Sequence, residues 1–340
     1  MYLLGEPIFA HSRQGEDFLI PLSQASLCHD FLKEKLTPAE VLTEIRVEYL
    51  SIVRALKQMG VDFRIVFAHE SLIDKPTLTC CVRLLDCRLA GFHPHTPVPC
   101  TAFPRDFATS LPKLLLLNPA MKVLIPEKDG HRVMATHIGE GGRLLSGKDT
   151  VIVCANNRLS YLELQEGAPA LELIKESGLN IIRFPYVVAE KLNPEGQSLG
   201  YFPNAHLDRC TSLLVGADNG LHLIVDPGLI TCKEDEAPVN CLDIQQTLEL
   251  LNINLTTLGL TVHVPGDLTV PYALNLMQFP DKRVLMTSGS PEVENLIRLI
   301  VGDGNVSTTE VPVRFLPLWQ YAGIRCLIGE LPEFILKKLH

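Results

Sequence analysis

The sequence has no uninterrupted apolar run of about 18 residues, the length that a membrane-spanning helix requires. No positive charge precedes an apolar stretch near Met1, and Glu6 and Pro7 interrupt that region, so we expect no secretory signal. Basic tails are missing, and 30 Lys and Arg against 39 Asp and Glu give a net charge of −9, which disfavours nucleic acid as a partner. These absences predict a cytoplasmic protein that binds neither nucleic acid nor a membrane.

The ten cysteines include no Cys-x-x-Cys pair, so neither a zinc ribbon nor a disulfide scaffold is indicated. We expect most of them to be small buried hydrophobic residues. The group His93, His95 and Cys100 lies in a proline-interrupted stretch without a second ligand cluster, so we expect no metal site. The segment Gly139–Gly142 lacks both the lysine of a phosphate loop and the full dinucleotide fingerprint, so we expect no cofactor.

The length and composition favour a single large globular domain. The chain has 340 residues, of which 46% are apolar and 20% charged, enough for a sizeable core and incompatible with intrinsic disorder. No linker rich in proline and serine and no block of charge divides it. We therefore expect a single domain over residues 1–340, and whether it forms a homo-oligomer stays open.

Helices followed by strands recur along the chain, preceded in several places by hairpins. The helix–strand pairs are expected at 38–59 with 61–67, 168–177 with 180–184, 243–251 with 261–264, and 291–301 with 307–313. The hairpins are expected at 144–154, at 210–225 around the turn signal Asn219-Gly220, and at 274–286. A hairpin–helix–strand unit repeated roughly every 50–70 residues predicts α/β blades around an axis, with an ordinary α/β layer fold as the alternative.

Five short segments carry reactive side chains next to glycine or proline. They are Phe103-Pro104-Arg105-Asp106, Gly139-Glu140-Gly141-Gly142, His206-Leu207-Asp208, Ser288-Gly289-Ser290-Pro291-Glu292 and Ala322-Gly323-Ile324-Arg325-Cys326. Each alone is typical of an ordinary turn or a buried strand. Their order along one chain is far more specific than any single segment.

In this order the segments resemble the guanidino-group-modifying enzymes, which include arginine deiminase, dimethylarginine hydrolase and the arginine amidinotransferases. The resemblance covers roughly residue 100 to the end, and the stretch from Tyr272 to Glu292 looks like the family's last hairpin and the start of the helix that follows. It implies a five-bladed α/β propeller (a pentein-like fold) and a small guanidino substrate. The implied catalytic residues are Cys326, His206 and Glu140, with Asp106 and Asp208 binding the substrate.

The chemistry explains why these residue types belong together. Carboxylates in the plane of a guanidinium can bind its N–H edges, as the resemblance implies for Asp106, Glu140 and Asp208. Cys326 is then the nucleophile that attacks the central carbon, and His206 acts first as general acid and then as general base. Carboxylates near Cys326 would raise the pKa of its thiol and so disfavour the thiolate. An imidazolium at His206 and a bound cationic substrate would lower that pKa.

The reaction class follows only in part. We expect a hydrolase that passes through a covalent amidino-thioester, with an amidinotransferase as the first alternative and a non-catalytic propeller used for binding as the second. Arg143 follows Glu-Gly-Gly where the family often has Asp, so we expect this side chain to face solvent or to pair with a neighbouring acid. Arg13, Arg83 and Arg105 are candidates for holding a substrate carboxylate.

Overall fold

The computed structural model describes residues 2–5, 9–11, 17–19, 38–67, 81–83, 104–106, 108–117, 132–139, 141–154, 162–184, 190–192, 198–201, 206–226, 259–266, 268–270, 272–320 and 323–330. The helices of these ranges are α2 (Pro38–Gln58), α4 (Pro169–Glu176), α6 (Pro291–Val301), α7 (Phe315–Gln320) and α8 (Ile324–Leu327). Short 3₁₀ turns precede or follow strands at η4 (Pro104–Asp106), η5 (His137–Gly139), η6 (Gly141–Arg143), η7 (Leu207–Arg209) and η9 (Asp303–Asn305).

The described strands are short, and most belong to one repeating pattern. They are β1 (Tyr2–Gly5), β2 (Phe9–His11), β3 (Asp17–Leu19), β4 (Phe63–Phe67), β5 (Cys81–Arg83), β6 (Ala108–Leu111), β7 (Leu114–Leu117), β8 (Arg132–Ala135), β9 (Leu144–Gly147), β10 (Thr150–Cys154), β11 (Asn180–Phe184), β12 (Glu190–Leu192), β13 (Ser198–Tyr201), β14 (Thr211–Val215), β15 (Leu221–Val225), β16 (Leu260–His263), β17 (Met277–Gln278), β18 (Val284–Met286), β19 (Val306–Thr308) and β20 (Ile328–Glu330).

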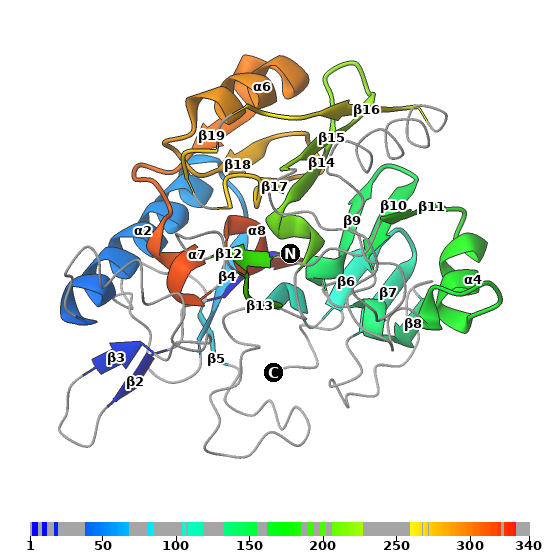
Figure 1. The fold of residues 1–340 in the computed structure, drawn as a ribbon, viewed down its shortest axis with the longest axis horizontal. Coiled ribbons are helices and arrows are strands. Elements are labelled where there is room, and N and C mark those ends of the chain that lie inside the picture. Colours follow the sequence, from blue (N-terminus) through cyan, green and yellow to red (C-terminus); the bar gives the residue numbers. More distant parts are fainter. Residues whose placement is uncertain are drawn as a thin grey trace.

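The same sheet plan occurs five times. In β6-β7-β8, β9-β10-β11, β14-β15-β16 and β17-β18-β19, an antiparallel hairpin is followed by a strand parallel to its second member. In the fifth sheet, β20 pairs with β1 in antiparallel orientation, as the first strand of a hairpin would. Strand β4 then pairs parallel with β1, and β5 pairs parallel with β4. The sheets lie around a common centre with α2, α4 and α6 on the outside (Figure 1). We call β6, β9, β14, β17 and β20 the inner strands, because all five contribute to the wall of one cavity.

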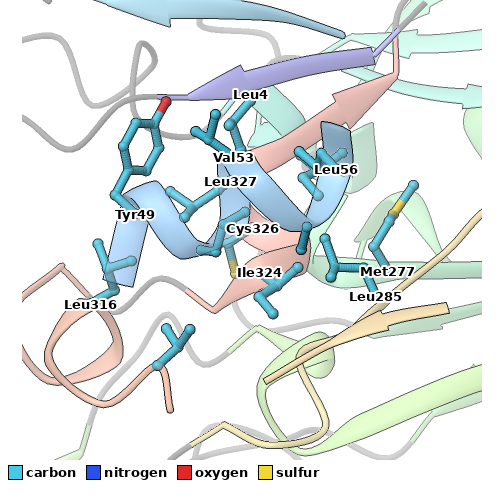
Figure 2. Close-up of a cluster of buried hydrophobic side chains, with 14 of the residues drawn as sticks. Leu4, Tyr49, Val53, Leu56, Met277, Leu285, Leu316, Ile324, Cys326 and Leu327 are labelled. Carbon is cyan, nitrogen blue, oxygen red and sulfur yellow. The ribbon is translucent and has the colours of Figure 1, made fainter. Parts of the chain in front are cut away.

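Helix α2 shows how the sequence builds an outer layer. Pro38 starts the helix, where a missing N–H costs nothing, and Gly60 follows it at a φ of +66°. Its buried stripe at helical spacing packs against residues from β1, β4, β18 and β20, and this stripe comprises Ile45, Tyr49, Ile52 and Leu56. Figure 2 shows this cluster, in which Cys326 lies among the apolar side chains. No described helix is both long enough and apolar enough to cross a membrane.

The α/β class and the hairpin-and-strand repeat are confirmed. The expected helices at 38–59, 168–177 and 291–301 and the three expected hairpins are present, while the expected helix at 243–251 lies outside the described residues. The expected strand at 307–313 is wrong in extent, because β19 ends at Thr308. The Thr309 hydroxyl donates to the carbonyl of Val311, and the amide of Val313 donates to the Thr287 hydroxyl, so side-chain hydrogen bonds replace the ladder there.

Candidate active site

Four of the five segments singled out in the sequence precede inner strands, while the fifth, 288–292, follows β18 and starts α6. Turn η4 precedes β6, η6 precedes β9, η7 precedes β14, and α8 precedes β20. These short elements also contact one another, η4 with η6 and α8, and η6 with η7. The fold therefore brings segments that are far apart in the sequence to one end of the inner strands.

Cys326 lies where this polar centre meets the apolar core. The residue is 4% exposed, and its neighbours Ile324 and Leu327 belong to the cluster under α2. Its sulfur accepts a hydrogen bond of 3.1 Å from Asn275 Nδ2 and lies 3.7 Å from Asp208 Oδ2. A thiol buried only among hydrocarbon would be chemically inert, whereas this one has an amide donor and a carboxylate beside it.

Asn275 holds the cysteine by two bonds. Its side-chain oxygen accepts from the backbone N–H of Cys326 at 3.1 Å, while its Nδ2 also donates to the backbone carbonyl of Asp208 at 2.9 Å. The close approach requires glycine at 323, because a Cβ there would lie 2.4 Å from the side chain of Asn275. Asn275 thus fixes the nucleophile and the acidic segment relative to each other.

Asp208 is fully buried, and its two oxygens differ. Oδ2 accepts from Arg325 Nη1 at 2.7 Å, while Oδ1 has no hydrogen-bond partner in the described part of the chain. An unsatisfied buried acceptor costs about 1–3 kcal/mol, more when charged, so Oδ1 is a place where a donor would be favoured. One half of the carboxylate is therefore used within the protein and the other half is available.

One arginine pairs with this carboxylate, and a second lies farther from it. Arg325, which is 6% exposed, also donates to the backbone carbonyls of Gly141 at 3.2 Å and Leu144 at 2.7 Å. Arg105 donates from Nε to Gly141 at 3.3 Å and from Nη1 to the sulfur of Met277 at 3.9 Å. Burial, and to a smaller degree the charge of Arg325, lower the pKa of Arg105 to about 9, so the group stays protonated at neutral pH.

His206 immediately precedes η7 in an extended conformation and is half-buried. Its imidazole lies directly against Gly142, where an added Cβ would stand 2.1 Å from Nδ1. Glycine at this position is therefore a condition for the observed place of the ring. The same contact brings η6 and η7 together at the centre.

Other expectations have different outcomes. Arg143 is 7% exposed and donates from Nη1 to the carbonyl of His137 at 2.7 Å, so the first alternative, that it faces solvent, is wrong, while its pairing with a neighbouring acid stays a prediction. The peptide carbonyl replaces water as its hydrogen-bond partner.

Glu140, Arg13, and the group His93, His95 and Cys100 lie outside the described residues. Asp106 ends η4 and Arg83 ends β5, but the side chains of both lie outside the described part.

Sequence reasoning assigned no role to Asn275 or Arg325. Both stand within segments that resemble the family, and each is a polar residue in an otherwise apolar run, Ala-Leu-Asn-Leu and Gly-Ile-Arg-Cys. A polar side chain in such a run is a signal of a buried hydrogen-bond network. The described residues contain no group of three His, Cys, Asp or Glu side chains placed to hold a metal ion.

Solved structures share this architecture. SxtG, an amidinotransferase from Microseira wollei in the saxitoxin biosynthetic pathway, superposes with a TM-score of 0.50 at 13% identity over 97% of this chain and 94% of that chain. The inosamine-phosphate amidinotransferase StrB1 from Streptomyces griseus gives 0.46 at 13% identity over 97% and 93%. A dimethylarginine dimethylaminohydrolase adduct gives 0.44 at 13% identity over 87% and 92%.

Neither a protein-family model nor a curated protein sequence matches this chain. The similarity to SxtG extends over nearly the whole length of both chains and shows the fold. It is the α/β fold that the order of the sequence segments implied. At this identity the chemistry has to be argued from the residues of this chain.

Proposed function

We propose that the chain is a cysteine-dependent hydrolase acting on the guanidino group of arginine or a small arginine-like molecule. One observation carries this proposal: the Cys326 sulfur lies 3.7 Å from Asp208 Oδ2, and Asp208 Oδ1 is buried without a hydrogen-bond partner in the described part of the chain. A guanidinium that donates to Oδ1 would have its carbon near the sulfur. We further propose a single catalytic domain over residues 1–340 that works in the cytoplasm without a cofactor.

The first half of the reaction uses Cys326 and His206. The thiol proton passes to His206, and the thiolate forms a bond to the central guanidino carbon. The tetrahedral intermediate then collapses, a C–N bond breaks, and the imidazolium gives its proton to the leaving amine. The product of this half is an amidino-thioester on Cys326.

The second half uses water and the same residues. Water adds to the carbon of the amidino-thioester while neutral His206 removes one of its protons. The C–S bond breaks, the thiolate leaves with its electron pair, and a ureido product is released. Return of the proton from His206 to the sulfur restores the starting state.

The charge of the centre depends on three acids. One carboxylate, that of Asp208, and the two guanidinium groups of Arg105 and Arg325 would leave a net positive charge, which would repel a cation. The proposal therefore needs the carboxylates of Asp106 and Glu140, the roles that the resemblance in sequence implies for them. With these included, three acids oppose the two arginines, and a guanidinium is attracted.

Two alternatives remain. An amidinotransferase shares the first half of the reaction and replaces water by an amine acceptor. A non-catalytic binding protein is favoured by one observation, the ion pair in which Arg325 already occupies Asp208 Oδ2. A guanidinium supplied by the chain itself then stands beside the residue assigned to bind the substrate.

The experiment that tests the proposal is incubation of the full chain with arginine, agmatine and methylated arginines. Ureido product, ammonia and amine are measured with and without glycine as acceptor, and the intact protein is weighed for a covalent adduct. We expect a ureido product and an adduct that C326S abolishes and C154A retains, since Cys154 is a core residue of β10. Product that appears only with glycine would support the transferase. The absence of product and adduct with every substrate would support the binding protein.

A further inference from the structure

A cavity of about 430 Å³ occupies the middle of the ring of inner strands. Its wall includes residues of all five inner strands and of three hairpin turns, represented by Lys148, Asn219 and Lys282. Arg105 and Arg325 line it as well, whereas Cys326, Asp208 and His206 do not. The turn residues belong to the ends of the inner strands away from Cys326, so the cavity extends from the arginines toward the hairpins.

The lining carries an excess of positive charge. Among the residues that the structure describes, its cationic side chains are Arg105, Lys148, Lys282 and Arg325, and its one carboxylate is Glu330. The whole chain has a net charge of −9, so this concentration of cations is opposite to the average of the protein. Positive charges collected on a concave, partly water-excluded wall favour an anion inside it.

Within the described part of the chain, most of these cations are not paired with a carboxylate. Lys282 donates to the carbonyl of Gly216 at 3.0 Å and to the side-chain oxygen of Asn219 at 2.6 Å, and Lys148 donates to the carbonyl of Asn219. These acceptors are neutral oxygens, which orient an ammonium group without cancelling its charge. Among the described residues, Arg325 is the one cation of this lining with an ion pair, and its partner is Asp208.

Among the cations of the cavity, Arg105 has the weakest hydrogen-bond acceptors. Its hydrogen bonds go to a peptide carbonyl and to a thioether, which is a weak acceptor, and no carboxylate in the described part of the chain lies within ion-pairing distance. Its planar fork of donors suits the two oxygens of a carboxylate or phosphate. Ser110 and Ser146, which also line the cavity, add hydroxyl donors.

We propose that this cavity binds a small oxyanion, a carboxylate or phosphate group held between Arg105 and the lysines of the hairpin turns. The volume lies in the range of small-ligand sites, about 300–1,000 Å³, so the anion has room for a small organic body. The cavity shares Arg105 and Arg325 with the polar centre around Cys326, but Cys326, Asp208 and His206 do not line it.

The test is titration of the full chain with inorganic phosphate and, separately, with succinate at constant ionic strength, by calorimetry and by thermal unfolding. We expect saturable binding of at least one probe with one site per chain. R105Q should weaken it at least tenfold, and the double variant K148Q/K282Q should weaken it several-fold. R132Q, which alters an exposed arginine paired with Glu176, should bind like the wild type.

The outcomes separate the possibilities. Saturation by phosphate alone assigns a phosphate ligand, and saturation by succinate alone assigns a carboxylate. C326S should bind the anion unchanged, so a failure of the guanidino chemistry would leave this result intact. The proposal is overturned if neither probe saturates, or if both R105Q and K148Q/K282Q bind with wild-type affinity.

Discussion

Arg325 donates to the carboxylate of Asp208 at 2.7 Å in a region where the two side chains are 7% and 0% exposed. Because Arg325 directly precedes Cys326, this ion pair also sets the position of the thiol. A buried pair of this kind is weak evidence for stability as a whole, but removing one partner is expensive because the other charge remains buried. The pair therefore has to be tested by changing both partners.

The double-mutant cycle gives the first prediction. D208N should lower the free energy of unfolding by about 3–5 kcal/mol, because Arg325 is left without its anion. R325M should be costly as well, and D208N/R325M should lose clearly less than the sum of the two single changes. Urea unfolding measures all three variants. The control D281N, at the exposed pair of Asp281 and Arg283, should lower the free energy of unfolding by under about 1 kcal/mol. Purely additive effects of D208N and R325M would contradict a direct coupling between the two side chains.

Loss of the Asn275 side chain gives the second prediction. N275A removes the donor to the Cys326 sulfur and the acceptor of its N–H, so the thiol loses its fixed position. We expect kcat to fall about tenfold or more with a smaller change in KM, because positioning acts on the reacting geometry. Alkylation by iodoacetamide should change in rate at Cys326. N305A, in η9 where the half-buried Asn305 donates to the carbonyl of Val301, is the matched control and should leave both measurements unchanged.

The contact between Gly142 and His206 gives the third prediction. In G142A the added methyl group would stand 2.1 Å from Nδ1, so the imidazole has to move. General acid–base catalysis is worth about 10²–10⁴-fold, and turnover should fall within that range while the adduct on Cys326 persists longer. Steady-state kinetics and intact mass measure both effects. G304A is the control, since a Cβ at Gly304 meets nothing within 4 Å; equal activity of the two variants would remove His206 from the mechanism.

Glu48 gives the fourth prediction, which concerns stability. Its carboxylate accepts from the backbone N–H groups of Arg314 at 2.6 Å, Phe315 at 2.8 Å and Leu316 at 2.9 Å, where α7 begins. In E48Q one oxygen becomes an NH₂ donor facing an N–H group, so the free energy of unfolding should fall by about 1–3 kcal/mol. Urea unfolding is the measurement. E44Q, on the exposed side of the same helix, should stay near the wild type, and a similar loss in both variants would argue against a specific role for Glu48.

The pH dependence of stability gives the fifth prediction. Burial raises the pKa of Glu48 from its ordinary 4.5 to about 7, although the backbone N–H bonds act in the opposite direction. Between these values the folded chain binds more protons at Glu48 than the unfolded chain does, so this group makes stability fall as pH rises from about 4.5 to 7. The difference in unfolding free energy between wild type and E48Q should therefore change across this window. A difference that is constant with pH would contradict the raised pKa.

Local patterns predicted much of the fold. The helix expected at 38–59 is α2 (Pro38–Gln58), and the turn signal Asn219-Gly220 joins β14 to β15 as expected. No unit was predicted for the sheet β6-β7-β8, because its hairpin turn carries Pro112-Lys113 rather than a glycine signal. Lys113 has a positive φ of 58° in this turn, and a lysine in the sequence does not predict such a conformation.

The site was predictable to a smaller extent. The proximity of Cys326 and Asp208 agrees with what the resemblance implied, although their roles stay predictions. The use of Asp208 by Arg325 and the two bonds of Asn275 to Cys326 depend on how distant segments pack, and no spacing in the sequence encodes them. The charge of the central cavity likewise comes from hairpin turns and short helical elements of different sheets, which only the packing brings together.

The pairing of β1 with β20 joins two segments that are far apart in the sequence: Leu4 lies opposite Ile328, two positions after Cys326. A ribosome makes β1 long before it makes β20, so this sheet keeps an open edge until β20 has been made. The centre around Cys326 can therefore form only after that point of synthesis. A tag or deletion that disturbs β1 would act directly on β20 and on the segment that carries Cys326.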